Sequence, residues 1–186
     1  MTAPQTPAVA DSTSATAGPR VVGLDLSLTS TGVASNYGWT DRIRTKLTGH
    51  ERLQHILDEI AAYTASADLV VIESLAFHGH DTEGASAGLA WLVRHRLWWK
   101  GKHYALVTPG QRMIYATGTG RADKDQVLAA VIRRYPAFDV ASNDEADALI
   151  LAAMGARHLG HPIDDLPLTH LRALDKVTWP ETAGAA

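Results

Sequence analysis

Two short apolar segments that each carry a carboxylic acid constrain this chain most. Residues 21–26 are apolar except for Asp25, and the apolar run 69–72 is followed directly by Glu73. Runs of this length and composition, bounded by turn-forming residues, predict buried strands. A charge within such a strand is costly unless something compensates it. Asp25 and Glu73 therefore need compensating partners.

The order of the other predicted elements indicates an α/β fold. Strands are predicted near residues 33–37 and 42–47, and a helix follows from a capping box between Thr48 and Glu51. The later elements are a strand at 104–107 and helices at 86–100, from Pro109, at 124–134 and, capped by Asn143, at 144–158. A hairpin meander followed by strand–helix alternation predicts a mixed five-stranded sheet with helices on both faces.

The 186 residues suffice for one domain with tails. Residues 1–19 are rich in Ala, Thr, Ser and Pro, which predicts a disordered tail. The domain is expected at 20–160, followed by a loosely ordered C-terminal extension at 161–186 with a helical turn near 171–176. The absence of cysteine, of a membrane-spanning segment and of a secretory signal pattern favours a cytoplasmic protein that does not bind membranes.

Two further acids, Asp144 and Asp147, lie three residues apart at a predicted helix start, so they share one helix face. Each acid alone has a simpler explanation: a turn former for Asp25, a strand-end surface residue for Glu73, a helix-start residue for Asp144 and a solvated helix residue for Asp147. Together they offer the oxygen ligands that Mg²⁺ prefers. Two such ions can activate water and stabilise charge at a phosphodiester, so the four acids predict a metal-dependent nuclease.

Four segments resemble, in order and at similar separations, the motifs of the RuvC-type Holliday junction resolvases, particularly their phage-like relatives. Residues 22–32 resemble the first motif, 71–73 the second and 144–149 the last. Residues 118–127 resemble the stretch in which glycines precede a lysine. The resemblance extends over residues 21–160.

This resemblance implies a ribonuclease-H-like fold, a homodimer, and paired symmetrical nicking of four-way DNA junctions with Mg²⁺, for which Mn²⁺ would substitute. It makes Asp25, Glu73, Asp144 and Asp147 the metal ligands and places Lys124 near the scissile phosphate. Phe77 falls near an aromatic that probes DNA at the crossover. The family's second basic position aligns nearest Met113, so Arg112 beside it is the candidate. The family's frequent Pro-Gly after the first Asp is replaced by Leu26-Ser27.

The expected DNA contacts have to be reconciled with a net charge of −3. Phosphate binding needs only a local basic face, and seven basic residues between Arg94 and Lys124 are opposed by Asp123 alone. The candidate DNA-binding residues are Phe77, Arg112, Arg121, Lys124, Thr29 and Ser30. Thr29 and Ser30 are equally explained as turn formers.

Two other features have alternative interpretations. His78-Gly79-His80-Asp81 resembles a metal-binding sequence, but a mobile DNA-facing segment beside Phe77 explains it better than a zinc site. Trp91 and Trp98 share a helix face, with Trp99 adjacent, which favours core or dimer packing over base stacking.

Rival functions remain open at this stage. A nuclease of the same fold could act on flaps, replication forks or RNA–DNA hybrids, because the metal site is common to all of them. A non-catalytic junction-binding module would not need the intact set of carboxylates. A sugar-kinase or actin-like ATPase would fit residues 25–32 as a phosphate loop, but it needs a second loop and about twice the length.

Overall fold

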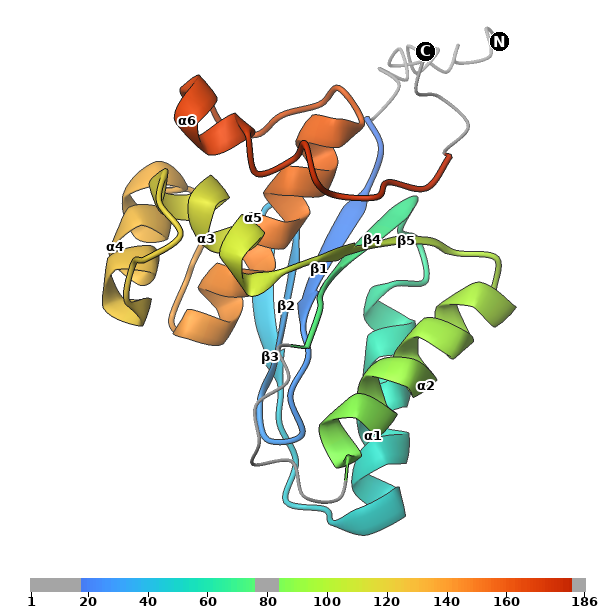
Figure 1. Cartoon of the computed structure of the whole chain (residues 1–186). Helices are drawn as coiled ribbons and strands as arrows, with labels where there is room; N and C mark the ends of the chain where they lie inside the picture. The colour runs from blue at the N-terminus through green and yellow to red at the C-terminus, as the bar shows by residue number, and fades with distance from the viewer. Residues whose placement is uncertain (1–17, 76–83, 182–186) are drawn as a thin grey trace, which may run out of the picture.

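The computed structural model describes residues 18–75 and 84–181. A five-stranded sheet with the order β3-β2-β1-β4-β5 forms its centre (Figure 1). The strands β1 (Val21–Asp25), β2 (Thr31–Ser35) and β3 (Trp39–Ile43) form an antiparallel meander. The strand β4 (Leu69–Glu73) runs parallel to β1, and β5 (His103–Val107) runs parallel to β4. The predicted mixed five-stranded sheet is confirmed.

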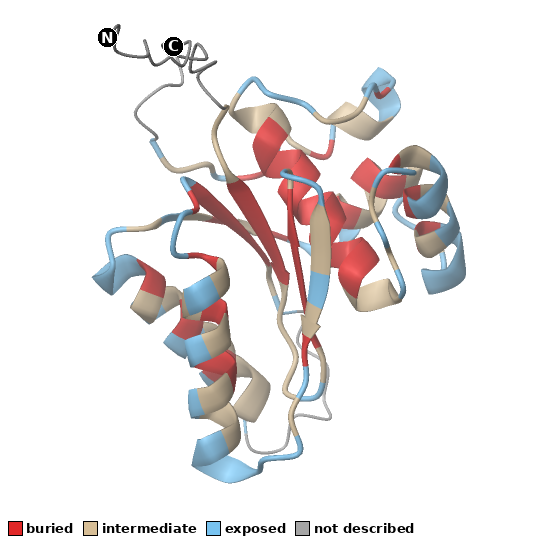
Figure 2. Cartoon of the chain, turned by 180° about the vertical axis from the view of Figure 1, so that it is seen from behind, coloured by how far each residue is buried: buried red, intermediate tan, exposed pale blue. Residues whose placement is uncertain are grey.

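Helices cover both faces of this sheet (Figure 1). The helices α1 (Gly49–Tyr63) and α2 (Ala85–Trp99) lie on one face. The other face carries α5 (Asn143–His158), with α3 (Pro109–Thr117), α4 (Lys124–Arg134) and the short α6 (Leu168–Leu171) packed around it. Alternate residues of β1 and β4 enter different cores, which explains why both strands are apolar up to their terminal acids and appear buried in Figure 2.

The helix α5 lies unusually close to the sheet because glycines face it. A Cβ atom on Gly23 would lie 2.0 Å from the carbonyl oxygen of Ala148, and one on Gly32 would lie 2.0 Å from that of Asp144. On the helix side, a Cβ on Gly155 would lie 2.7 Å from side-chain carbons of Val21 and Val71. These contacts fix the first turns of α5 at the end of β1 and the beginning of β2.

Local signals misjudged the capping of two helices and the bounds of one strand, although α1 does begin directly after Thr48 as predicted. Thr48 makes no capping hydrogen bond through its side chain, so the predicted box with Glu51 is wrong. The cap of α5 is Ser142, whose hydroxyl accepts from the backbone N–H of Glu145 at 3.3 Å, and not Asn143. The strand predicted at 42–47 is β3 at Trp39–Ile43, where pairing with β2 determines its ends.

The C-terminal extension is better packed than its prolines suggested. Leu166, Ala173 and Val177 are buried in the core on the α5 side, and the helix lies at Leu168–Leu171 rather than near 171–176. The Asp164 side chain has no exposure and accepts hydrogen bonds from Tyr115 at 3.0 Å, Arg157 at 2.5 Å and Tyr135. The hydrogen bonds and the ion pair of Asp164 thus hold the C-terminal segment in addition to the burial of its three apolar side chains.

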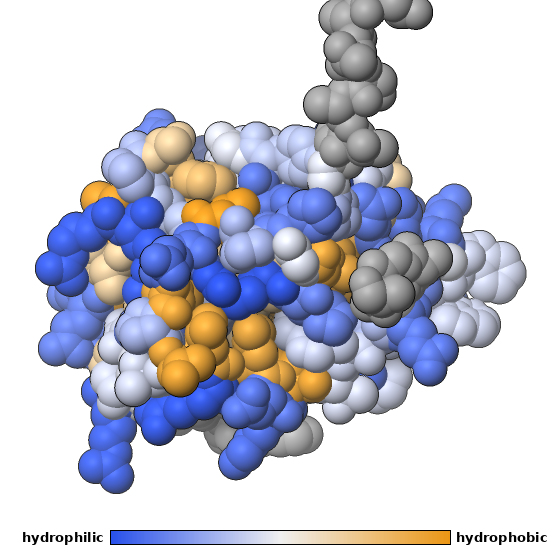
Figure 3. Space-filling model, turned by 90° about the horizontal axis from the view of Figure 1, so that it is seen from above, coloured by the Kyte–Doolittle hydropathy of each residue, from blue (hydrophilic) through white to orange (hydrophobic). Residues whose placement is uncertain are grey.

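The end of the molecule that carries α6 and the C-terminal segment is drawn from above in Figure 3, where hydrophobic surface gathers in one area amid hydrophilic side chains. Of the N-terminal segment expected to be disordered, residues 1–17 lie outside the described part of the chain. None of the helices within the described ranges is long and apolar enough to span a membrane.

The three tryptophans of α2 do not enter the core. Trp91, Trp98 and Trp99 are 64%, 65% and 72% exposed, whereas Leu89, Val93 and Leu97 form the buried stripe of this helix. Core packing is therefore the wrong interpretation for these tryptophans. Dimer packing stays a prediction.

Candidate metal centre

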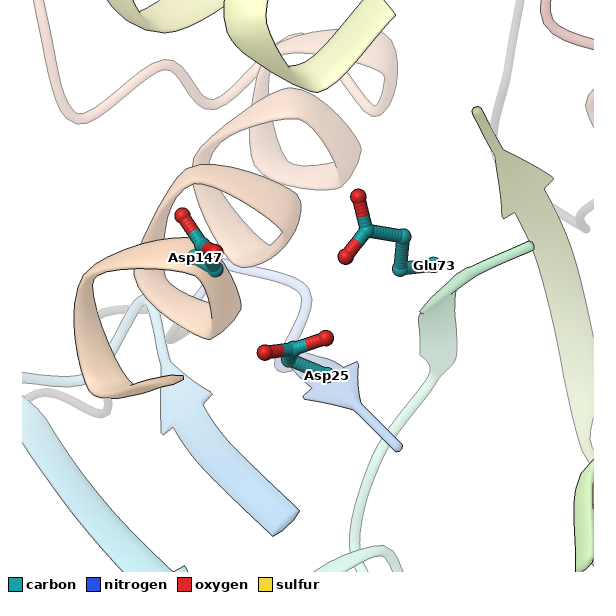
Figure 4. Close-up of side chains that lie close together, drawn as sticks. All are labelled: Asp25, Glu73 and Asp147. Atoms are coloured by element: carbon teal, nitrogen blue, oxygen red, sulfur yellow. The ribbon is translucent and has the colours of Figure 1, made fainter. Parts of the chain in front are cut away.

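Three of the four predicted carboxylates converge. Asp25 ends β1, Glu73 ends β4 and Asp147 lies near the start of α5 (Figure 4). One oxygen of each lies within 4.8 Å of the others. The register explains the convergence: Leu24 pairs with Ile72 in parallel strands, so the following acids emerge at the same sheet edge. The close packing of α5 on β1 and β2 then brings Asp147 over that edge.

Burial and mutual repulsion make this cluster unfavourable as three free anions. Burial raises the pKa of Asp25 to about 9, and the charge of Glu73 and a hydrogen bond with it contribute in the same direction. Burial also raises the pKa of Asp147 to about 7, opposed by the positive charges of Arg112 and Lys124. The protein therefore concentrates negative charge where a cation would relieve it.

The guanidinium of Arg112 lies among these acids. The Nε atom of Arg112 donates to Glu73 Oε1 at 2.9 Å, and its Nη1 donates to Asp147 Oδ1. Arg112 is carried by α3, which begins with a capping box between Thr108 and Gln111 directly after β5. Sequence reasoning placed Arg112 at the DNA but missed its ion pairs with the carboxylates. The available signal was its position shortly after β5, the strand beside the one that carries Glu73.

Asp144, the fourth predicted ligand, is not part of the three-acid cluster. Its Oδ2 accepts a hydrogen bond from the Ser30 hydroxyl at 2.6 Å. Its charge nevertheless raises the pKa of Asp147, so it lies near the cluster. Ser27 and Thr29 hydrogen-bond to each other through their hydroxyls at 3.0 Å, so Thr29 has the turn role that the sequence allowed.

The basic candidates lie around the cluster. Lys124 is the first residue of α4, is exposed, and lies close enough to lower the pKa of Asp147. Arg121 is exposed in the preceding loop. Phe77 and the segment His78–Asp81, including its alternative as a zinc site, lie outside the described residues.

The donor set fits a hard divalent cation. Within the described ranges, Asp25, Glu73 and Asp147 are the one group of three potential metal ligands whose donor atoms converge. All three supply carboxylate oxygens, which suit Mg²⁺ or Mn²⁺. The raised pKa values and the arginine between two of the acids both indicate a site that requires positive charge.

Comparison with known proteins identifies the fold. No protein-family model matches the chain, and no curated protein matches its sequence. The structure of Thermus thermophilus RuvC in complex with a Holliday junction substrate matches with a TM-score of 0.58 and 18% identity, over 72% of this chain and 90% of that one. Another Thermus thermophilus RuvC structure matches with a TM-score of 0.60 and 19% identity, over 76% of this chain and 97% of that one. The chain therefore has the ribonuclease-H-like fold of the RuvC-type Holliday junction resolvases.

Proposed function

We propose that this protein is a Mg²⁺-dependent endodeoxyribonuclease that resolves four-way DNA junctions by paired, symmetrical nicks. The observation that carries the proposal is the convergence of Asp25, Glu73 and Asp147 at one edge of a ribonuclease-H-like sheet. One similar structure holds a Holliday junction substrate, which supports a junction as the DNA substrate.

The proposed ligands are Asp25, Glu73 and Asp147, with Asp144 as the fourth, three residues before Asp147 on α5. Divalent ions bound there would activate the attacking water and stabilise charge on the phosphate. The chain's own contribution is to hold the carboxylates on three rigid elements. Lys124 provides a positive charge beside the cluster for the scissile phosphate.

DNA binding is proposed for the basic and hydroxyl groups around this site. Arg121 and Lys124 are exposed at the loop before α4 and at its first residue, and Thr29 and Ser30 border the cluster through the turn after β1. Arg112 and Phe77 complete the proposed set. Local positive charge of this kind binds phosphates even though the chain is acidic overall.

Paired nicks require two active sites, so the proposal includes a homodimer. The exposed Trp91, Trp98 and Trp99 of α2 provide aromatic surface of the kind that a second copy covers. They lie on the helical layer opposite α5.

The test is a cleavage panel with Mg²⁺ that compares a mobile four-way junction, a flap, a linear duplex and an RNA–DNA hybrid. The proposal expects symmetrical nicks in the junction, lost in Asp25→Asn and Glu73→Gln and retained in the control Asp58→Asn, an exposed acid on α1 that pairs with Arg96. Preferential cleavage of the flap or the hybrid would assign the same site to another nuclease reaction. Normal cleavage by the Asp25 and Glu73 variants would refute the site itself.

A further inference from the structure

Arg112 joins two layers of the protein through its guanidinium. One nitrogen contacts Glu73 at the end of β4, and another contacts Asp147 on α5. The three side chains are 10%, 12% and 11% exposed, so solvent screens these ion pairs only weakly. A planar guanidinium with several donors can bridge two carboxylates in this way, whereas a lysine ammonium is a single point charge.

The guanidinium uses the carboxylates that a metal ion would need. Glu73 and Asp147 are two of the three converging acids, and Arg112 is hydrogen-bonded to one oxygen of each. Its charge also opposes the upward shift of the pKa values of Asp25 and Asp147. A divalent ion placed among the same oxygens would repel a guanidinium only a few ångströms away. The two cations therefore compete for one set of ligands.

We propose that Arg112 is an internal counter-ion of the metal centre, bound to Glu73 and Asp147 in the metal-free protein and displaced when a divalent ion binds. This inference rests on the proposed function only in that the three acids bind metal. Arg112 thereby keeps the carboxylates together without metal, and it weakens metal binding because its two ion pairs must break first. The arginine is a positioning residue in this role.

The test uses the full-length chain stripped of metal with EDTA. It compares the wild type with Arg112→Gln and Arg112→Lys. The control is Arg96→Gln, which removes a remote ion pair between Arg96 on α2 and Asp58 on α1. Mn²⁺ affinity is measured by calorimetry, and thermal unfolding is followed in EDTA and in saturating Mn²⁺. Charge-assisted hydrogen bonds affect equilibria by about tenfold or more. We therefore expect Arg112→Gln to bind Mn²⁺ about tenfold more tightly than wild type, with Arg112→Lys between them.

The same variant should melt at a lower temperature than wild type in EDTA and show a larger rise in melting temperature with Mn²⁺. A variant that folds only when Mn²⁺ is present would give the same support. Weaker Mn²⁺ binding by Arg112→Gln would overturn the inference, because it would mean that Arg112 prepares the carboxylates for metal. If Arg112→Gln does not fold under either condition, the affinity of Arg112→Lys decides between the two directions.

Other outcomes of these experiments would contradict the proposed function rather than the role of Arg112. If wild type does not bind Mn²⁺, or binds it equally well after Asp25→Asn, the three acids are not a metal site. If metal exchange behaves as expected but no DNA substrate is cleaved, the counter-ion role holds and the nuclease proposal does not.

Discussion

Asp25 and Glu73 follow the paired residues Leu24 and Ile72 of two adjacent parallel strands, and a carboxylate oxygen of each lies within 4.8 Å of one on the other. Burial, followed by the negative charge of Glu73, disfavours the ionised form of Asp25 and raises its pKa to about 9. The backbone register of the sheet thus brings two acids together at a buried position, where the protonated form of Asp25 is favoured in the absence of metal. A divalent cation would replace that proton.

The first prediction concerns pH. The folded-state pKa values of Asp25 and Asp147 are about 9 and about 7, and both lie above the unfolded value of 3.8. At a pH between the unfolded and the folded value of each acid, the folded protein therefore binds more protons than the unfolded chain. The metal-free protein should therefore lose stability as pH rises from about 4 to 9, with each group contributing at most about 1.4 kcal/mol per pH unit. Urea unfolding in EDTA across this range measures the slope.

Asp25→Asn should flatten that slope. Saturating Mg²⁺ should also flatten it in the wild type, because a metal ion at the proposed site would bind the ionised acids. Stability that rises with pH in EDTA would contradict the assigned shifts.

The second prediction separates chemistry from binding at the carboxylates. Asp147→Asn should lower the junction cleavage rate by about a hundredfold or more, since metal-assisted catalysis contributes several kcal/mol. Junction affinity, measured by gel shift in Ca²⁺, should change little. Asp58→Asn is the matched control. Equal losses of rate and affinity would indicate that Asp147 acts through DNA binding or folding.

The third prediction concerns Lys124, which is exposed at the first residue of α4 and acts electrostatically on Asp147. Lys124→Ala should reduce single-turnover cleavage by about tenfold or more while changing the junction Kd by less, because the proposed function places its charge at the scissile phosphate. Arg121→Ala should show the reverse pattern. If Lys124→Ala lost only affinity, Lys124 would be a phosphate anchor.

The fourth prediction tests the close approach of α5 to the sheet. Gly32→Ala would place a Cβ 2.0 Å from the backbone oxygen of Asp144, and backbone cannot move aside as a flexible side chain can. We expect a loss of about 3 kcal/mol in the free energy of unfolding, with weaker metal binding because α5 carries Asp147. Gly88→Ala in exposed α2, which meets nothing within 4 Å, should be neutral or slightly stabilising by urea unfolding. A stable Gly32→Ala protein would contradict this packing.

The fifth prediction concerns Asp164, whose buried carboxylate accepts from two tyrosines and Arg157. Asp164→Asn should cost about 3 kcal/mol because it leaves Arg157 without its charge partner. Limited proteolysis should then release the C-terminal segment sooner than in wild type or in the exposed control Asp175→Asn. Unchanged proteolysis would show that apolar burial alone holds the segment.

The sequence predicted the sheet and the convergence of three of the four acids because both depend on local patterns. Uninterrupted apolar strands indicate burial on two faces, and an acid after each of two parallel neighbours must emerge at one edge. The ion pairs of Arg112 could not be read in this way, since they depend on how α3 packs across the sheet edge. The same holds for Ser30 and Asp144, which are far apart in the chain and meet only through the close contact at Gly32.

The C-terminal extension was misjudged for a related reason. Proline-rich spacing with few apolar residues is typical of loose structure, but the buried side chain of Asp164 accepts hydrogen bonds from α3, from α5 and from the residue that follows α4. The predicted cap of α5 was wrong by one residue. Ser142 and Asn143 are equally good caps by residue type, and in the structure Ser142 is the cap.

The C-terminal segment also has a practical consequence for shortening the protein. The imidazole Nδ1 of His170 lies 2.8 Å from the carbonyl oxygen of Tyr115, and Arg172 donates to that of Gly118 at 3.1 Å, so the segment braces the loop that leads to Arg121 and Lys124. A version that ends at Gly160 would remove the buried Leu166, Ala173 and Val177, expose the core surface that they cover, and free this loop. Fusions and truncations should therefore keep the chain through at least Trp179, which stacks on His158 at 4.3 Å.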